Sequence, residues 1–360
     1  MKHVAPPSVA AKNSLVSVFI PAYNAAAFIE ETLRSLLAQS HSQIEIVVLD
    51  DASTDDTAAR VASFADVRLR YLRNERNIGQ FQTMSRAAEL TRGQFIAICH
   101  ADDVYEPDSV ATELAFLLAH PQAGAVFAQN NIIDEAGRLL ARVTIAPQFA
   151  GRPLLEYDEI FRDLLRNTNQ LLCCPTFMAR REVLLEAGAF DGERYRIAAD
   201  LDMWLRILRR HPVGVLADRL VNYRRSKEQQ SSKYRRMRTT PDEFFAIMDR
   251  YVELDGFNVR LEPADRREYE FHRFDDAIFR AANLVILGRP DEAQPLLSLG
   301  FPWPSLVLRP RRRKVRVLLV QSTSRLLLWA RQATALARLL RWSEYGDRTG
   351  VSASGPVGLK

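Results

Sequence analysis

Apolar runs and amphipathic stretches alternate along the first third of the chain. Between the runs, apolar residues recur every three or four positions, as on one face of a helix, and residues 28–37 show this pattern. Strands separated by helices of about 10–15 residues are typical of βαβ units. We therefore predict an α/β fold with a mostly parallel sheet flanked by helices. The predicted strands are residues 16–20, 44–49, 68–72, 95–99 and 125–133.

Polar side chains follow directly after three of these strands. They come in pairs, which are Tyr23 and Asn24, Asp50 and Asp51, and Asp102 and Asp103. In an open α/β sheet, ligands bind outside the carboxyl ends of the strands. The pattern therefore predicts one ligand-binding crevice. No glycine precedes Gly79, so the glycine-rich dinucleotide fingerprint and the P-loop are both absent after the first strand.

Asp102 and Asp103 lie in a short connection before the helix that Pro107 opens. Two adjacent carboxylates repel each other unless a cation or hydrogen-bond donors lie between them. Mg²⁺ or Mn²⁺ held by one or two carboxylates and substrate phosphates is the ordinary arrangement. The alternative is a structural pair that accepts hydrogen bonds from amides at the helix start.

Two further acidic pairs also admit a structural and a functional interpretation. Asp50 and Asp51 suit a turn, and Asp51 could instead accept a hydrogen bond from a nucleobase imide. Asp200 and Asp202 begin an amphipathic helix, where aspartate is commonly a cap. The functional alternative for Asp200 is a general base held over the crevice.

Six segments in order resemble the motifs of the family-2 glycosyltransferases, which have the GT-A fold. The resemblance spans residues 15–232 and leaves the rest of the chain unexplained. The segments are Val18-Phe-Ile-Pro-Ala-Tyr-Asn24, Leu49-Asp-Asp-Ala-Ser-Thr-Asp-Asp-Thr57, Asn77-Ile-Gly79, His100-Ala-Asp-Asp103, Pro175-Thr-Phe-Met178 with Gly188-Ala-Phe-Asp191, and Ala199-Asp-Leu-Asp-Met-Trp-Leu-Arg206.

The resemblance implies a role for each matching residue. Pro21, Tyr23 and Asp51 would line the nucleotide-base pocket, and Ala22, Asn24 and Asp50 belong to the same nucleotide-sugar-binding segments. Asp102 would lie near the ribose, and Asp103 would ligate the metal that bridges the donor diphosphate. Asp200 matches the catalytic base. Mg²⁺ or Mn²⁺ is the implied cofactor.

The chain departs from the family pattern at three positions. Ala199 stands where an acid often precedes the base, and Ser85 stands where an Asn is common. The third is a missing His after Tyr223-Arg224-Arg225-Ser226. Residues 219–238 hold eight Lys/Arg and one acid, and suggest a mobile basic loop. Arg224, Arg225 or Lys227 could contact the diphosphate, or the loop could be a solvated connector.

The net charge of +5 comes from one C-terminal segment. Residues 309–342 contain ten Lys/Arg and no acid, which leaves 39 basic and 44 acidic residues elsewhere. The composition therefore does not indicate nucleic-acid binding. Residues 311–342 suggest a basic interfacial helix on an anionic membrane, with arginines including Arg316 opposite Leu318, Trp329, Leu336 and Leu340. The alternative is a helix packed on the protein or in a dimer.

The remaining composition favours a globular cytoplasmic protein, either free or peripheral on the inner face of the plasma membrane. No secretory signal and no run of 18 apolar residues is visible. Three cysteines, two of them adjacent, do not suggest a disulfide scaffold, and we expect buried apolar thiols. The predicted division is a tail (1–14), a catalytic domain (15–235), a helical region (236–305), a basic helix (306–345) and a tail (346–360).

These observations together predict an inverting, metal-dependent glycosyltransferase. Its donor would be a nucleotide sugar, UDP-linked by resemblance, and its acceptor a saccharide or a lipid-linked glycan of the cell surface. One alternative is a non-catalytic nucleotide-sugar-binding or scaffold protein. Another is a sugar nucleotidyltransferase, which would need a glycine- and Lys/Arg-rich loop after the first strand.

Overall fold

The computed structural model describes residues 13–226, 237–255, 259–303 and 312–329, together with positions 335, 336 and 339. Most of the predicted N-terminal tail and all of the predicted C-terminal tail lie outside these residues. The chain forms two compact units, Met1–Glu159 with Leu171–Ser226, and Ile160–Gln170 with Lys227–Lys360. The Ile160–Gln170 segment thus belongs to the second unit.

The first unit contains the strands and the helices between them. Its elements are β1 (Val16–Ala22), α2 (Ile29–Leu37), β2 (Ile44–Asp50), α3 (Thr57–Ala62), β3 (Leu69–Arg73), α4 (Gln80–Ser85), α5 (Ala87–Leu90), β4 (Phe95–Ile98), β5 (Val104–Tyr105), α6 (Ser109–Ala119), β6 (Ala125–Ile133), β7 (Leu139–Arg142), η1 (Cys174–Thr176), β8 (Phe177–Arg180), α8 (Arg181–Ala187), α9 (Gly192–Tyr195), η2 (Arg196–Ala198), α10 (Ala199–Leu208) and β9 (Val213–Arg224).

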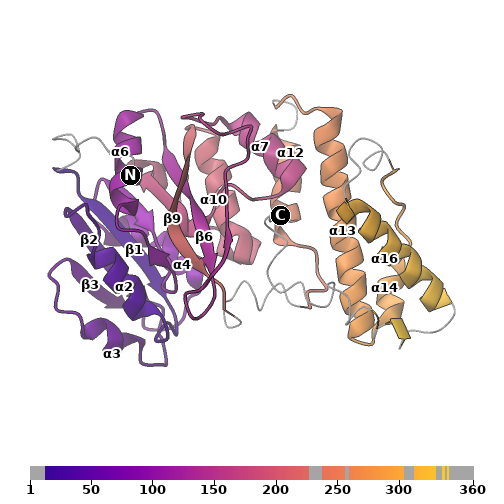
Figure 1. Cartoon of the computed structure of the whole chain (residues 1–360), viewed down its shortest axis with the longest axis horizontal. Coiled ribbons are helices and arrows are strands. Elements are labelled where there is room, and N and C mark those ends of the chain that lie inside the picture. Colours follow the sequence, from indigo (N-terminus) through magenta and orange to yellow (C-terminus); the bar gives the residue numbers. More distant parts are fainter. Residues whose placement is uncertain are drawn as a thin grey trace. The chain divides into compact units, whose positions relative to one another are not determined.

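One sheet runs through this unit in the order β3-β2-β1-β4-β8-β6-β9-β5, with β7 beside β6. Figure 1 labels five of its strands, β1, β2, β3, β6 and β9. The β3-β2-β1-β4 half is entirely parallel, as predicted. Beyond it the pairing is mixed, because β8 is antiparallel to both β4 and β6. Residues of β2 are buried throughout, as expected for a strand covered on both faces. The five predicted strands are confirmed within one or two residues.

Helix α2 shows how the sequence pattern positions the site. Its apolar residues Ile29, Leu33 and Leu36 are fully buried in the core beside β1 and β2. Thr32 on the same helix is equally buried but polar, and it faces the loop after β4. The helix therefore serves both as a core element and as a support for that loop.

The second unit is helical. Its elements are most of α7 (Tyr157–Asn167), α12 (Glu243–Asp255), α13 (Pro263–Ile286), α14 (Pro290–Leu297) and α16 (Arg312–Trp329). A capping box formed by Glu262 and Asp265 begins α13, with Pro263 at the first helical position. Helices α13, α14 and α16 contact one another around a core that includes Phe271, Ile278 and Val317; Figure 1 shows them side by side.

Helix α16 packs with its polar side inward. Lys314 is buried, and its ammonium lies 2.7 Å from Glu268 of α13. Gln321 donates to the carbonyls of Leu297 and Leu299 at the end of α14. Three apolar side chains are exposed, Val315 (43%), Leu319 (61%) and Leu326 (62%). At 100° per residue these three fall within an arc of about 40°.

This arrangement corrects the predicted orientation of the C-terminal helix. Leu336, expected on the membrane-facing side, is fully buried in the core of the second unit, and Leu318 is half-buried. The side chains of Trp329 and Leu340 lie outside the described residues, as do those of most of the predicted arginine face. Among the described helices, none is both long enough and apolar enough to cross a bilayer.

Candidate active site

Hydrogen bonds join the loop after β1 to the loop after β2. The amide of Asn24 donates to Ser53 Oγ (2.9 Å), and the Asn24 side-chain oxygen accepts from the amide of Thr54 (2.9 Å). Asn24 adopts a φ of +49°, which asparagine tolerates better than most residues. The amide of Ala25 donates to Thr57 Oγ1 (2.8 Å). The two predicted nucleotide-binding segments therefore form one rigid edge.

Asp51 is buried and accepts three hydrogen bonds. Its Oδ1 accepts from Asn74 Nδ2 (2.8 Å) and the amide of Ile78 (2.9 Å), and its Oδ2 accepts from the amide of Gly79 (2.8 Å). Gly79 has a φ of +92°, a conformation that favours glycine. The carboxylate thus orders the Asn77-Ile-Gly79 motif. A carboxylate has about four lone-pair sites, so one remains for a ligand.

Asp50 is fully buried and has a different environment. Its Oδ1 accepts from the amide of Ser53 (2.8 Å), its Oδ2 accepts from the Tyr71 hydroxyl, and Arg73 lies 3.6 Å from Oδ2. Burial and the bond to Asp50 raise the pKa of Tyr71 to about 12. The structure therefore places Asp50 as the support of the turn after β2.

Three predicted residues come from the end of β1. Ala22 is buried, pairs with Asp50 across the sheet and accepts from the amide of Asp51 (2.7 Å). Pro21 is half-buried, and Tyr23 is 52% exposed. The Tyr23 ring is thus the accessible surface at this edge.

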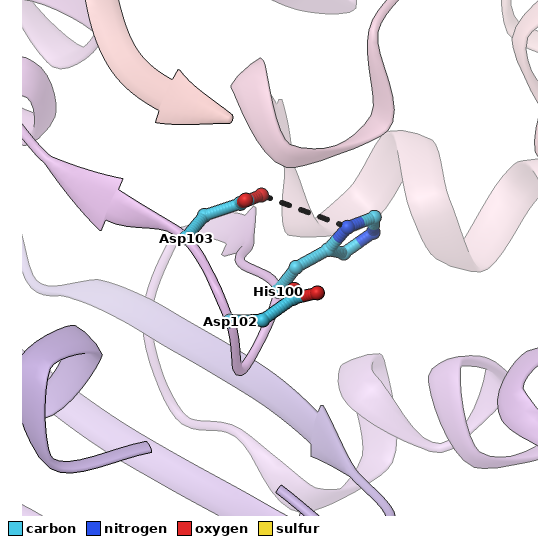
Figure 2. Close-up of side chains that lie close together, drawn as sticks. All are labelled: His100, Asp102 and Asp103. Carbon is cyan, nitrogen blue, oxygen red and sulfur yellow. Dashed lines mark ion pairs between the residues drawn. The ribbon is translucent and has the colours of Figure 1, made fainter. Parts of the chain in front are cut away.

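The turn after β4 carries His100, Asp102 and Asp103, which Figure 2 shows with their side chains gathered. His100 Nδ1 lies 3.7 Å from Asp103 Oδ2, and one ligand atom from each of the three residues lies within 4.8 Å of the others. Helix α2 holds this turn, because the Thr32 hydroxyl lies 2.7 Å from the carbonyl of Asp103. The amide of His100 donates to the Tyr105 hydroxyl (2.8 Å).

Asp103 is fully buried, and its two oxygens differ. Oδ1 accepts from the amide of Arg224 (2.8 Å), whereas Oδ2 has no hydrogen-bond partner among the described residues. Burial and the neighbouring Asp102 raise the pKa of Asp103 well above its usual value. Burial lowers the pKa of His100, which favours a neutral imidazole with a lone pair to offer.

Arg224 is the site residue whose position the sequence does not indicate. Residues 219–224 belong to β9 rather than to a mobile loop, and Arg224 is 1% exposed. Its guanidinium donates to the carbonyls of Asp102, Asp134 and Glu135 and to the carboxylate of Glu31 on α2. It also lies 4.7 Å from the centre of the Phe28 ring.

These contacts make the predicted bond from Arg224 to a diphosphate wrong, because the guanidinium is buried by protein acceptors. Arg224 instead fixes the acidic turn. Of the two other basic candidates, Arg225 is half-buried and its amide donates to the carbonyl of Ile133 (2.8 Å), and Lys227 lies outside the described residues. The sequence gives no specific signal for the role of Arg224, because it is one of eight basic residues in 219–238.

Asp200 lies in the first turn of α10 and is half-buried. Trp204, one turn later, is fully buried and packs against Phe177 with ring centroids 4.0 Å apart, as predicted for a core residue. Arg206 accounts for the end of this motif, because it donates to Asp202 and to the carbonyl of Ala189. The residues from Ala199 to Arg206 thus anchor α10 and fix the position of Asp200.

The cysteines connect Asp200 to the acidic turn. Burial raises the pKa of the Cys173 and Cys174 thiols, and the carboxylates of Asp103 and Asp200 raise both further. Both carboxylates therefore act on one short turn, η1, which packs against β4, β6 and β9. Cys99 and Cys174 are buried, as expected, and Cys173 is half-buried.

The acidic turn suits a divalent cation. A buried carboxylate oxygen without a hydrogen-bond partner lowers the stability of a protein. Among the described residues, Asp103 Oδ2 is such an oxygen. Carboxylate oxygens are the ligands that Mg²⁺ prefers, and imidazole nitrogen suits transition-metal ions. His100, Asp102 and Asp103 are the residues that could hold such an ion.

The chain is similar in sequence to known glycosyltransferases. Residues 17–188 match the model of glycosyl transferase family 2. The putative teichuronic acid biosynthesis glycosyltransferase TuaG of Bacillus subtilis is 31% identical over 198 residues, which are 54% of this chain and 73% of TuaG. The Escherichia coli UDP-Glc:alpha-D-GlcNAc-diphosphoundecaprenol beta-1,3-glucosyltransferase WfgD is 27% identical over 204 residues, 56% of this chain and 73% of WfgD.

A solved structure shares the fold. The crystal structure of Staphylococcus aureus TarS residues 1–349 in complex with UDP-GlcNAc superposes with a TM-score of 0.57 and 22% sequence identity, and covers 78% of each chain. The expected GT-A architecture of a mostly parallel sheet flanked by helices, followed by C-terminal helices, is confirmed. With the identity to TuaG, these matches establish that the chain belongs to glycosyl transferase family 2 and is a glycosyltransferase.

Proposed function

We propose that this enzyme transfers a sugar from a UDP-sugar to a hydroxyl of a saccharide or lipid-linked acceptor, with inversion and with the help of a divalent cation. The observation that carries the proposal is the acidic turn, where the buried Oδ2 of Asp103 has no hydrogen-bond partner among the described residues. Asp200, at the start of a helix anchored in the core, supports the proposal as a second carboxylate.

The edge formed by the loops after β1 and β2 supports a nucleotide-base pocket. The exposed ring of Tyr23 offers a stacking surface, and Asp51 has one lone-pair site left for the imide of a pyrimidine. Pro21, Ala22 and Asn24 shape this edge, and Asp50 holds its turn. WfgD is named for a UDP-Glc donor, and the TarS structure is a complex with UDP-GlcNAc. Both names favour a UDP-linked donor for this chain.

The strands β1 and β4 are parallel neighbours, so the loop after β1 and the acidic turn follow the same edge of the sheet, which supports a diphosphate beside the turn. Asp103 would hold Mg²⁺ or Mn²⁺, and Asp102 would lie near the ribose. A divalent ion bound there neutralises negative charge on the diphosphate and stabilises its departure by several kcal/mol. Arg224 keeps the turn in place through the Asp102 carbonyl and Asp103.

Asp200 would act as the general base. Its carboxylate accepts the proton of the acceptor hydroxyl while the oxygen attacks the anomeric carbon from the side opposite the leaving nucleoside diphosphate. The new bond is acceptor oxygen to carbon, and the broken bond is carbon to phosphate oxygen. One displacement of this kind inverts the anomeric centre and leaves no covalent enzyme intermediate.

The acceptor is proposed from the relatives. TuaG is named for teichuronic acid biosynthesis and WfgD for a diphosphoundecaprenol-linked acceptor. A cell-surface glycan, free or lipid-linked, is therefore the acceptor class we propose.

A membrane surface suits α16 in its observed orientation. The exposed row of Val315, Leu319 and Leu326 is flanked by Arg316 and Arg325, in a segment with ten Lys/Arg and no acid. An apolar row beside cations favours an anionic leaflet, where each cation adds roughly 1 kcal/mol. We propose this contact at the inner face of the plasma membrane, through the exposed row and not through Leu336.

The test uses Asp200→Asn with Glu193→Gln, an exposed residue of α9, as its control. Binding of UDP, GDP, TDP and CMP with and without Mn²⁺ is measured by thermal stabilisation, and turnover by release of the nucleotide from its sugar. We expect UDP with Mn²⁺ to stabilise all three proteins. Asp200→Asn should lose about 10²–10⁴-fold in turnover, and Glu193→Gln should not.

Two results would contradict the proposal. If none of the nucleotides stabilises the protein, the proposed donor site is wrong, and a scaffold protein becomes the favoured interpretation. Full turnover in Asp200→Asn would remove the base assignment while leaving the donor site intact.

A further inference from the structure

His100 stands at the head of the acidic turn, and its ring is directed at the Asp103 carboxylate (Figure 2). Its Nδ1 lies 3.7 Å from Asp103 Oδ2, which is beyond the range of a hydrogen bond between the two. The two atoms are therefore close without bonding to each other. Such a gap between a nitrogen and a carboxylate oxygen has the dimension of a cation.

Each of the two side chains has one buried polar atom without a hydrogen-bond partner among the described residues. Asp103 is fully buried and its Oδ2 has no hydrogen-bond partner, and His100 Nε2 is equally buried and unpartnered among the described residues. Most buried polar side-chain atoms in folded proteins have a partner. The unpartnered Asp103 Oδ2, with His100 Nδ1 3.7 Å away, points to a missing ligand between these two atoms.

The surrounding structure holds both groups in place. Asp103 Oδ1 is fixed by the amide of Arg224, so Oδ2 faces the gap. The main chain of His100 is fixed by the Tyr105 hydroxyl. The His100 side chain is 20% exposed, so its ring is not sealed from solvent.

The distances fit an octahedral ion. With metal–ligand bonds of about 2.1 Å, neighbouring ligands lie about 3 Å apart and opposite ligands about 4.2 Å apart. The separation of 3.7 Å between His100 Nδ1 and Asp103 Oδ2 lies between these two values. One ligand atom of Asp102 lies within 4.8 Å of both other residues, so it belongs to the same group.

We propose that His100 is a direct ligand of the divalent ion, so that the site consists of one imidazole nitrogen and the carboxylates of the turn. This rests on the proposed metal-dependent function. An imidazole ligand favours transition-metal ions over Mg²⁺, which prefers oxygen. The chain should therefore bind Mn²⁺ and Co²⁺ in clear preference to Mg²⁺.

The test measures metal binding directly on the full chain with UDP. Mn²⁺ binding is followed by the loss of the free-ion EPR signal, and ¹⁴N coupling to bound Mn²⁺ by electron spin-echo modulation. The variants are His100→Ala, His100→Asp and Asp103→Ala. His120→Gln is the matched control, because His120 is half-buried just after the last turn of α6, with Nδ1 3.0 Å from the carbonyl of Phe116.

We expect ¹⁴N coupling in the wild type and in His120→Gln, and none in His100→Asp. Mn²⁺ affinity should fall at least about tenfold in His100→Ala. In His100→Asp, the preference for Mn²⁺ over Mg²⁺ should shrink by a similar factor, because an oxygen replaces the nitrogen.

Two outcomes separate this inference from the proposed function. In the first outcome, Mn²⁺ binds the wild type but not Asp103→Ala, and the bound ion shows no ¹⁴N coupling. This result would overturn His100 as a ligand and leave the metal requirement standing. Absence of Mn²⁺ binding to the wild type with UDP would overturn the metal requirement itself.

Discussion

The main-chain amide of Arg224 donates a 2.8 Å hydrogen bond to Oδ1 of Asp103, 121 residues earlier in the chain. The side chain of Arg224 donates to the carbonyl of Asp102 at 2.9 Å. The end of β9 thus holds both the backbone and a carboxylate of the acidic turn. The geometry of the candidate metal site therefore depends on a residue that need not touch the substrate.

Replacing Arg224 with alanine should destabilise the first unit. The carbonyl of Asp102 and the carboxylate of Glu31 would each lose a hydrogen bond, and the Phe28 ring would lose its contact with the guanidinium. The loss of a buried hydrogen-bond partner costs about 1–3 kcal/mol. We expect the free energy of unfolding to fall by about 2–4 kcal/mol, measured by urea denaturation. Mn²⁺ affinity should fall as well.

Arg138→Ala is the matched control. Arg138 is 81% exposed and pairs with the side chain of Asp134, and an exposed pair of this kind contributes little. Equal losses in Arg138→Ala and Arg224→Ala would show that the buried network does not stabilise the turn.

Asp51→Asn should lower the free energy of unfolding and also the affinity for the nucleotide. The substitution places an NH₂ group or a weaker acceptor among the three donors, Asn74 and the amides of Ile78 and Gly79. We expect a loss of about 1–3 kcal/mol in unfolding free energy, measured by urea denaturation. Asp56→Asn, at an exposed position in the same loop, should stay within about 0.5 kcal/mol of the wild type. An Asp51→Asn protein as stable as the wild type would contradict the structural role.

The bond between Tyr71 and Asp50 predicts a dependence on alkaline pH. The pKa of Tyr71 in the folded protein, about 12, exceeds its value of about 10 in an unfolded chain. The protonated hydroxyl therefore stabilises the fold fully below pH 10, and this contribution is lost as the pH rises towards 12. Tyr71→Phe should cost about 0.5–1.5 kcal/mol at pH 8.

The measurement is urea denaturation of both proteins at pH 8, 10 and 11. The difference between the wild type and Tyr71→Phe should shrink as the pH rises. A difference that stays constant over this range would mean that the hydroxyl does not donate to Asp50.

Glutamate at Leu319 and Leu326 should reduce binding to vesicles that contain phosphatidylglycerol. Both side chains are more than half exposed, so the substitutions remove apolar surface and add repulsion without disturbing the core. Binding is measured by co-sedimentation, with thermal unfolding as the check on folding. Leu140→Glu, 57% exposed in the first unit, should bind vesicles as the wild type does. Unchanged binding of the α16 double variant would rule out the exposed row as the membrane contact.

Local patterns in the sequence were sufficient for the α/β fold. Apolar runs such as 44–49 can be buried only as strands of about this length, and amphipathic periodicity identifies α2. The position of the polar pairs also follows from the sequence, because parallel strands bring their carboxyl ends to one edge. His100, Asp102, Asp103 and the family motifs are therefore recognisable in the amino-acid sequence alone.

The tertiary structure decided what each of these groups does. Asp50 and Asp51 are adjacent, yet one is enclosed by Ser53 and Tyr71 and the other orders the loop at Gly79. Arg224 was one of three candidates for a diphosphate contact and is instead buried against the acidic turn. Helix α16 turns Lys314 inward and Leu319 outward, opposite to what its composition suggests. Which lone pair, donor or face is occupied depends on partners distant in sequence, and only the packing of the chain brings those partners together.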